Sequence, residues 1–213
     1  MSELLFEPAT DEHAFKHLVD SVSGAVRLDG AFPRFPFRRQ GYVSIIDWGC
    51  VISPILGRAL EQLTNMYGDT HVEVYGRNLS TDNFRDSYGY FPGFVVATEQ
   101  VNAGYQAGIS KNWNPRPGFI NSLDVLAQRI AVVGSSGHWA LWGERRWEIG
   151  LLQTSDELDL EEFDYLPLYD RNSDFTGCLP PEGWGGYPKE IVDHFVNTVR
   201  TQGRPPRDEA SLA

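Results

Sequence analysis

The segment HVE at positions 71–73 carries the pair of side chains best suited to acid–base chemistry. A histidine two residues before a glutamate begins the signature of zinc deaminases, in which the glutamate transfers protons beside a metal-bound water. That chemistry also requires a Pro-Cys-x-x-Cys segment, whereas Cys50 and Cys178, the two cysteines of the chain, lie far apart. The sequence lacks most of the ligands of such a zinc site, and we reject this interpretation.

Two other groups of reactive side chains are weaker candidates. The segment GSSGH at 134–138 places Ser135 near His138, but it lacks the strand, sharp turn and helix around the nucleophile of a Gly-x-Ser-x-Gly hydrolase. Its composition is typical of a turn. His13 and His17 are one helical turn apart, but a metal site needs a third ligand. We therefore expect neither a bound metal nor a cofactor.

If the chain is an enzyme, its residues favour a hydrolase acting on a small polar or sugar substrate. Asp47 ends one expected strand, and His71 and Glu73 lie on another, so these three are the candidate acid and base groups. Two aromatic-rich segments without periodicity, 77–93 and 102–120, would line the substrate pocket, because long irregular loops are often functional.

The same aromatic side chains allow a third interpretation, a carbohydrate-binding module. In such a module Trp113, Tyr105 and Phe119 would stack on sugar rings. These rings would equally suit a role in covering the edges of the core, as loops commonly pack their own side chains.

Four segments combine the apolar spacing of a helix with residues that start and stop helices. The second is the clearest, because Ser53 suits an N-cap, Pro54 the first turn and Gly68 the end. The first has Thr10 as its expected N-cap. The expected helices cover 11–22, Pro54 to the residue before Gly68, 122–130 and 188–200.

Strands are expected between these helices, at 42–48, 70–76 and 94–98. In the second of them the residues alternate, so Val72 and Val74 share one face of the sheet. The opposite face then carries His71, Glu73 and Tyr75.

Three tryptophans lie within nine positions of the segment SGHWALWGERRWEIGLL, residues 136–152. A turn over 144 and 145 would make this segment a β-hairpin in which aromatic side chains pair across the strands. Because paired aromatics in strands usually pack, we interpret the cluster as structural rather than as a ligand platform. The expected cross-strand pairs are Trp142 with Trp147, Ala140 with Ile149, and Trp139 with Gly150.

The mixed order of helices and strands, with a hairpin near the end, predicts a single α+β domain. We expect residues 1–203 to form this domain around a largely antiparallel β-sheet, with helices packed mainly on one face. Residues 204–213 are expected to be a flexible C-terminal tail.

The net charge of the 213-residue chain is −11, and most of it lies near the C-terminal end. Residues 1–150 hold 16 acids and 13 bases, a net −3, whereas residues 151–213 hold 13 acids and 5 bases, a net −8. Nucleic-acid binding needs a basic surface, so no nucleic-acid partner is expected. This charge is compatible with a basic protein partner, and the alternative is a solvated acidic loop that aids solubility.

The cellular location follows from what the sequence lacks. The opening MSELLFEPATDEH is acidic and has neither the basic start nor the apolar run of a secretion signal. No stretch approaches the roughly 20 apolar residues of a membrane span. The two distant cysteines do not make a disulfide framework. We expect a cytoplasmic protein without a membrane partner.

Residues 122–152, SLDVLAQRIAVVGSSGHWALWGERRWEIGLL, combine a short helix, a Gly/Ser link, a strand ending in W-x-x-W-G-E-R and a return strand W-E-I-G-L-L. This arrangement resembles a segment of bacterial immunity proteins of polymorphic and contact-dependent toxin systems. The resemblance implies a small, acidic, non-catalytic cytoplasmic protein that binds and neutralises a cognate toxin domain. It assigns no toxin-contacting residue by itself.

A contact surface is expected in the acidic stretch SDELDLEEFDYLPLYD, residues 155–170, which has seven acids and no base. The acids alternate with Leu158, Leu160, Phe163 and Tyr165, and such apolar side chains can anchor an interface while charges steer the encounter. The alternative is an acidic loop packed by its own aromatic residues. The expected partner-binding residues are Asp156, Glu157, Asp159, Glu161, Glu162 and Asp164.

Overall fold

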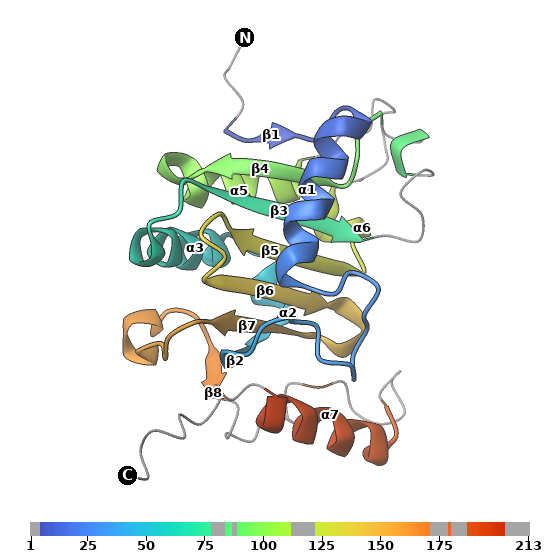
Figure 1. Ribbon diagram of the computed structural model, residues 1–213, viewed down its shortest axis with the longest axis vertical. Coiled ribbons are helices and arrows are strands. Elements are labelled where there is room, and N and C mark those ends of the chain that lie inside the picture. Colours follow the sequence, from blue (N-terminus) through green and yellow to red (C-terminus); the bar gives the residue numbers. More distant parts are fainter. Residues whose placement is uncertain are drawn as a thin grey trace.

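A computed structural model describes residues 5–77, 84–86, 89–111, 122–170, 179 and 187–202 (Figure 1). The strands in this part of the chain form one eight-stranded sheet of order β1-β4-β3-β5-β6-β7-β2-β8, in which all neighbours run antiparallel. The strands are β1 (Glu7–Pro8), β2 (Tyr42–Asp47), β3 (His71–Arg77), β4 (Gly93–Ala97), β5 (Arg129–Gly134), β6 (Trp139–Glu144), β7 (Ile149–Thr154) and β8 (Leu168–Asp170).

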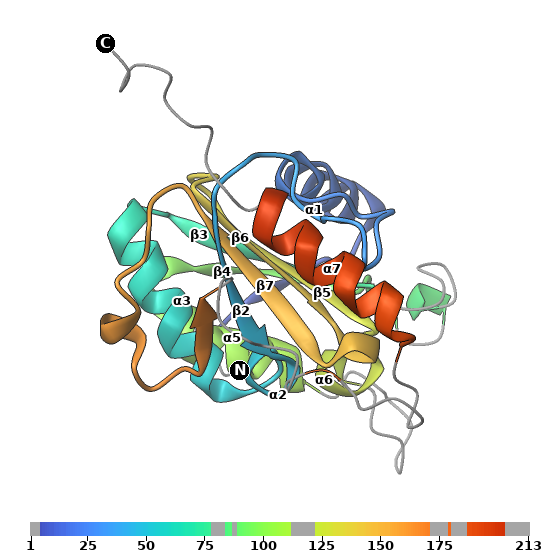
Figure 2. The ribbon, with the colours of Figure 1, turned by 90° about the horizontal axis from the view of Figure 1, so that it is seen from below.

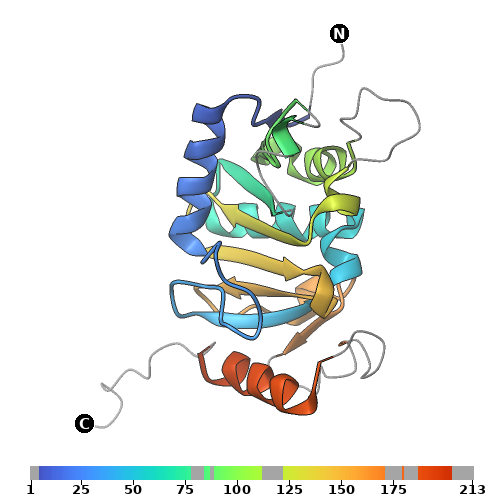
Figure 3. The same ribbon diagram turned by 90° about the vertical axis from the view of Figure 1, so that its right-hand side faces the viewer.

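Helices cover both faces of this sheet. Figure 2 shows one layer above it, with α1 (Glu12–Ala25) and α7 (Lys189–Gln202). Most of the described helices form the other layer, which Figure 3 shows from the side: α2 (Trp48–Val51), α3 (Pro54–Tyr67), α5 (Val101–Ser110) and α6 (Leu123–Leu126). Short 3₁₀ helices are η1 (Thr98–Gln100), η2 (Arg145–Trp147) and η3 (Leu160–Phe163). The expected α+β domain, with its antiparallel sheet and helices mainly on one face, is confirmed.

The sheet separates two apolar cores, because its central strands are buried on both sides. Every residue of β6 and β7 is buried. Successive side chains alternate between the layers, so Leu141 and Leu152 pack toward α3, whereas Trp142 and Leu151 pack toward α1 and α7. Burial on both faces explains why these strands have apolar runs rather than the polar alternation of a half-exposed strand.

The helices whose ends are set by local residues agree best with expectation. Helix α3 begins at Pro54 after the N-cap Ser53, and it ends before Gly68, whose φ of 66° lies in the left-handed region. Helix α7 also lies where expected. Helix α1 does too, although its N-cap is Asp11, whose carboxylate accepts from the Ala14 amide at 2.8 Å, and not Thr10.

Two expectations between residues 101 and 134 are wrong. Helix α6 ends at Leu126, and the chain then enters β5. It is a strand and not a continued helix because the apolar residues of β5 pack between β3 on one side and β6 on the other. Helix α5 was missed because glycine weakens the helical pattern. Its Gly108 lies so close to the Phe94 ring that a Cβ there would stand 2.5 Å from the ring, which explains the glycine.

The hairpin of β6 and β7 forms, but its register differs from the expected one. Trp142 lies opposite Leu151, and Trp147 belongs to η2 in the turn. The turn is longer than expected because η2 is followed by Glu148 in the left-handed conformation, with a φ of 55°. The expected pairs Ala140 with Ile149 and Trp139 with Gly150 are therefore also wrong: their partners are Gln153 and Thr154.

The expected faces of the hairpin residues are nevertheless correct. The true register is offset by an even number of residues, so each side chain stays on its face. Trp142 and Trp147 are both 1% exposed and belong to the core beneath α1 and α7. Trp139 does cover a glycine, but the glycine is Gly134 of β5.

Trp147 joins three separate parts of the chain. Its ring stacks on Tyr187, with centroids 3.9 Å apart, and lies 4.8 Å from the ring of Phe195 in α7. The Phe32 ring meets it edge-on at 5.9 Å. The turn of the hairpin is thereby fixed to α7 and to the loop after α1.

We expect Trp147→Ala to lower the free energy of unfolding by about 3–5 kcal/mol, since it removes a fully buried ring whose neighbours cannot all close the gap. Urea denaturation measures this loss. The matched control is Met66→Ala on α3, because Met66 is 46% exposed and its truncation should leave the midpoint nearly unchanged. Equal midpoints for wild type and Trp147→Ala would contradict the packing described above.

Candidate functional site

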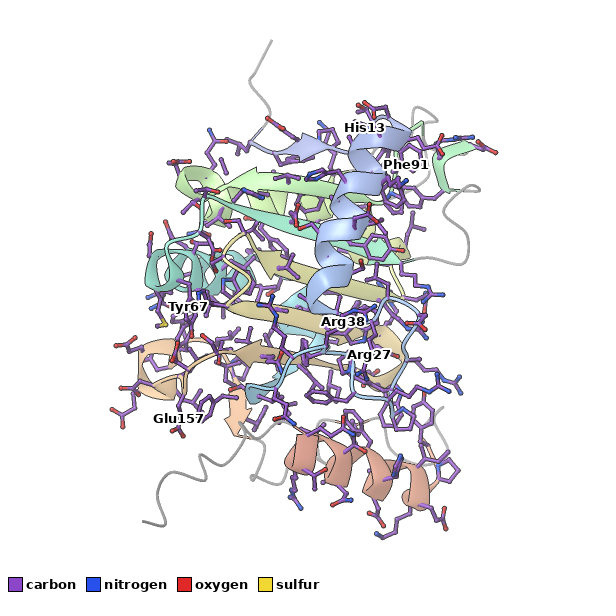
Figure 4. The ribbon with its side chains drawn as sticks, viewed as in Figure 1. His13, Arg27, Arg38, Tyr67, Phe91 and Glu157 are labelled. Carbon is purple, nitrogen blue, oxygen red and sulfur yellow. The ribbon has the colours of Figure 1, made fainter. Side chains whose placement is uncertain are left out.

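The expected partner-binding residues lie between β7 and β8, in the segment that leaves the sheet after Thr154 and contains η3. All six carboxylate side chains are exposed. Figure 4 shows Glu157 at the periphery of the molecule, far from Phe91 and His13. We call this set the acidic surface: Asp156, Glu157, Asp159, Glu161, Glu162 and Asp164.

The apolar residues of the same segment face the opposite way. Leu158 and Phe163 are buried in the core beneath α3, and Leu160 and Tyr165 are partly buried against it. This corrects the expectation that these four side chains anchor a partner, because burial in the chain's own core leaves them little surface to offer. Their burial in the core anchors the segment and leaves its six carboxylates at the protein surface.

Polar contacts with α3 fix the segment further. The Tyr165 hydroxyl donates to Gln62 Oε1, and Gln62 Nε2 donates to the carbonyl oxygen of Glu162 at 3.1 Å. The guanidinium carbon of Arg58 lies 4.0 Å from the centroid of the Tyr165 ring. The acidic surface is therefore carried by a segment attached to the fold at several points.

Helix α3 adds a carboxylate that sequence reasoning missed. The Glu61 side chain is exposed and accepts a hydrogen bond from Asn102 Nδ2 at 3.1 Å. Burial raises the pKa of the Tyr165 hydroxyl; Arg58 opposes this rise, and the Asp164 and Glu61 carboxylates add to it. Glu61 thus lies near the segment that carries the acidic surface. No local signal could have identified it, since the two segments meet only in the fold.

The candidate acid and base groups do not form one site. The side chains of His71 and Glu73 approach each other at 3.9 Å between Nε2 and Oε1, and the Ser21 hydroxyl donates to Glu73. Three strands of the sheet separate them from Asp47, which ends β2, whereas His71 begins β3. Asp47 instead caps α2 by accepting from the Gly49 amide at 2.6 Å. Asp47 therefore cannot act together with His71 and Glu73 in one hydrolase site.

The aromatic residues proposed to stack on a sugar are not available as a set. Tyr105 is fully buried within α5, and its hydroxyl donates to the carbonyl oxygen of Val51 at 2.6 Å. This correction removes it as a surface platform. Trp113 and Phe119 lie outside the described residues.

The GSSGH segment forms the turn between β5 and β6, as expected. Buried Asp69 holds this turn, because its carboxylate accepts from the Ser136 amide at 2.5 Å and from Trp139 Nε1 at 2.7 Å. The Ser135 hydroxyl accepts from the Thr70 amide at 2.9 Å. These contacts give the serines a structural role.

Metal and membrane sites were also sought in the part of the chain that the structure describes. No group of three or more histidine, cysteine or carboxylate side chains in that part could hold a metal ion. His13 and His17 are exposed on α1. None of the helices described is both long and apolar enough to cross a membrane.

A pocket of about 450 Å³ lies at the end of β7 opposite to the acidic surface, and sequence analysis did not anticipate it. The register places Arg77 of β3 beside Arg129 of β5, and Arg129 beside Glu144 of β6. The sequence shows only that Glu144 is followed by two arginines. It cannot show the row of charged residues across three strands, because that row depends on the register of the strands. We call this site the arginine pocket; the charged and polar side chains that line it are Arg77, Gln128, Arg129, Glu144, Arg146 and Tyr187.

Glu144 is the buried carboxylate of this pocket, with 3% of its surface exposed. Its Oε1 accepts from Trp142 Nε1 at 3.0 Å and from the Phe32 amide at 2.8 Å, and its Oε2 lies 3.5 Å from Arg129 Nε. Burial raises the pKa of Glu144, and these three contacts partly offset the rise.

Comparisons with known proteins add no assignment to this geometry. No protein-family model, curated protein or solved structure matches the chain. Function therefore has to be argued from the acidic surface and the arginine pocket.

We expect Glu144→Gln to change how stability depends on pH. The native carboxyl holds its proton more tightly than the unfolded one, so in the wild type this group lowers stability as the pH rises from about 4.5 through the raised pKa. Glutamine keeps an acceptor for Trp142 and Phe32 but does not titrate. The variant should gain stability relative to wild type between pH 4.5 and 7, as measured by urea unfolding. A difference that stays constant over this range would contradict the assignment.

Proposed function

We propose that the chain is a non-catalytic immunity protein that binds and neutralises a cognate bacterial toxin domain through the acidic surface. One observation carries the proposal: six exposed carboxylates stand on a segment whose apolar side chains are fixed in the chain's own core. The similarity of residues 122–152 to immunity proteins supports the same conclusion.

Charge defines the kind of partner. Exposed carboxylates in one segment attract a basic surface and accelerate its approach. A toxin that acts on nucleic acid has such a surface, because it must bind phosphates. The acidic surface would then occupy the positions of substrate phosphates and block access to the toxin's site.

The attachment of this segment to the fold contributes to affinity in addition to the contribution of its charge. Contacts from Tyr165 and Gln62 hold the backbone before any partner arrives. Binding then loses less conformational freedom than it would with a flexible loop. Since Leu158 and Phe163 stay in the core, we expect binding to rest on charge and to weaken steeply with salt.

The test is a triple charge reversal, Glu157→Lys, Glu161→Lys and Glu162→Lys, assayed against the toxin domain encoded by the neighbouring gene. These side chains are exposed, whereas Asp159 is left in place because its carboxylate accepts from the Glu161 amide at 3.0 Å and caps η3. The association rate at low salt should fall by roughly tenfold or more. Stopped-flow or surface-binding kinetics at two salt concentrations measure the effect.

The control reverses three exposed glutamates elsewhere, Glu7→Lys, Glu99→Lys and Glu148→Lys, and so changes the net charge by the same amount. This variant should keep an association rate close to wild type. Equal slowing by the two variants would show a general effect of net charge. An unchanged rate in the first variant, with its fold intact by circular dichroism, would exclude the acidic surface as the contact.

A further inference from the structure

The arginine pocket concentrates positive charge in an acidic protein. Among the described residues that line it, three are arginines and one is a glutamate, which gives a net charge of +2 in a chain of net charge −11. Its volume of about 450 Å³ falls within the range of small-molecule sites. This pocket differs from the acidic surface in both charge and position.

The strand register brings two of these positive charges close together, which destabilises the folded chain. Arg77 and Arg129 are directly opposite each other on neighbouring antiparallel strands, so their side chains share a face. Like charges in such a pair are destabilising unless an opposite charge lies between or beside them. The pair therefore needs an anion.

Glu144 meets this need only for Arg129. One carboxylate oxygen accepts the hydrogen bonds from Trp142 and Phe32, and the other faces Arg129. Arg77 donates to the carbonyl oxygen of Leu28, a neutral group. Within the described residues its guanidinium has no carboxylate partner.

Arg146 supplies a second guanidinium at the same pocket that has no carboxylate partner among the described residues. It is exposed, and its guanidinium carbon lies 4.9 Å from the centroid of the Tyr187 ring. That ring is in turn stacked on buried Trp147. The aromatic stack gives Arg146 a defined position without cancelling its charge.

We infer that the arginine pocket binds a small dianion, a phosphate monoester or a dicarboxylate, with Arg77 and Arg146 as the main contacts. Guanidinium groups present paired donors that match the oxygens of phosphate and carboxylate. Two arginines without a carboxylate partner in the described part of the chain match two negative charges, and a phosphate monoester carries close to −2 at neutral pH. The ligand supplies the charge that the row of Arg77, Arg129 and Glu144 lacks.

This inference does not depend on the proposed function. The arginine pocket is lined from the end of β3, the start of β5, the end of β6 and η2, whereas the acidic surface follows the end of β7. A strand of six residues spans about 20 Å. Binding of a small anion can therefore be measured on the chain alone, without the toxin.

Isothermal titration calorimetry with the full chain tests the inference, with inorganic phosphate, succinate and chloride as separate probes at neutral pH. We expect saturable binding of phosphate or succinate and none of chloride. Binding of phosphate alone identifies a phosphorylated ligand, and binding of succinate alone identifies a dicarboxylate. If neither binds better than chloride, the inference is wrong.

Three substitutions locate the site. Arg77→Gln and Arg146→Gln should each weaken binding about tenfold or more, because each removes a charged pair of donors. Arg146 is exposed, so its variant tests the site even if Arg77→Gln perturbs the fold. Arg85→Gln is the control, since Arg85 is exposed beside Asp86 and does not line the pocket. Equal weakening by Arg85→Gln and Arg146→Gln would overturn the assignment.

Discussion

The central strands are buried on both faces, and this burial determines where charged side chains can lie in this protein. Strands β6 and β7 have no exposed residue, and helices cover the layers above and below them. A charge placed within these layers would lose its hydration without gaining a partner. The buried acids show the consequence: Glu73 accepts from the Ser21 hydroxyl, and Asp69 accepts from the Ser136 amide and the Trp139 indole of the turn that it holds. The acidic surface and the arginine pocket lie instead at the two ends of β7.

The two ends of β7 consequently carry opposite charges. Residues that follow the strand form the acidic surface, and residues that precede it contribute to the arginine pocket. Each feature is fixed by one of the two cores, since Phe163 packs beneath α3 and Trp147 packs against α7 on the opposite face. A basic partner that approaches along the field of this molecule would meet the acidic end first. The arginine pocket would stay open to a small anion.

Local signals explain which parts of the fold could be predicted from the sequence. Pro54 stands at the start of α3 and Gly68 takes the left-handed conformation at its end, so local residues set its bounds and the prediction was correct. The hairpin register was wrong because it depends on how η2 turns and on the left-handed Glu148. The same limit applies to function. The acids between residues 156 and 164 lie close together in the sequence, which is enough to predict them as one group. The row of Arg77, Arg129 and Glu144 instead requires the register of three strands.

Backbone hydrogen exchange, measured for the chain alone and in the presence of the proposed toxin domain, tests the central claim most directly. The claim is that the protein acts by binding through the acidic end of the sheet. Binding should slow exchange in residues 155–166 and on α3, and leave η2 and the adjoining ends of β5 and β6 unchanged. Slowed exchange confined to η2 and α7, or no slowing anywhere, would contradict the claim.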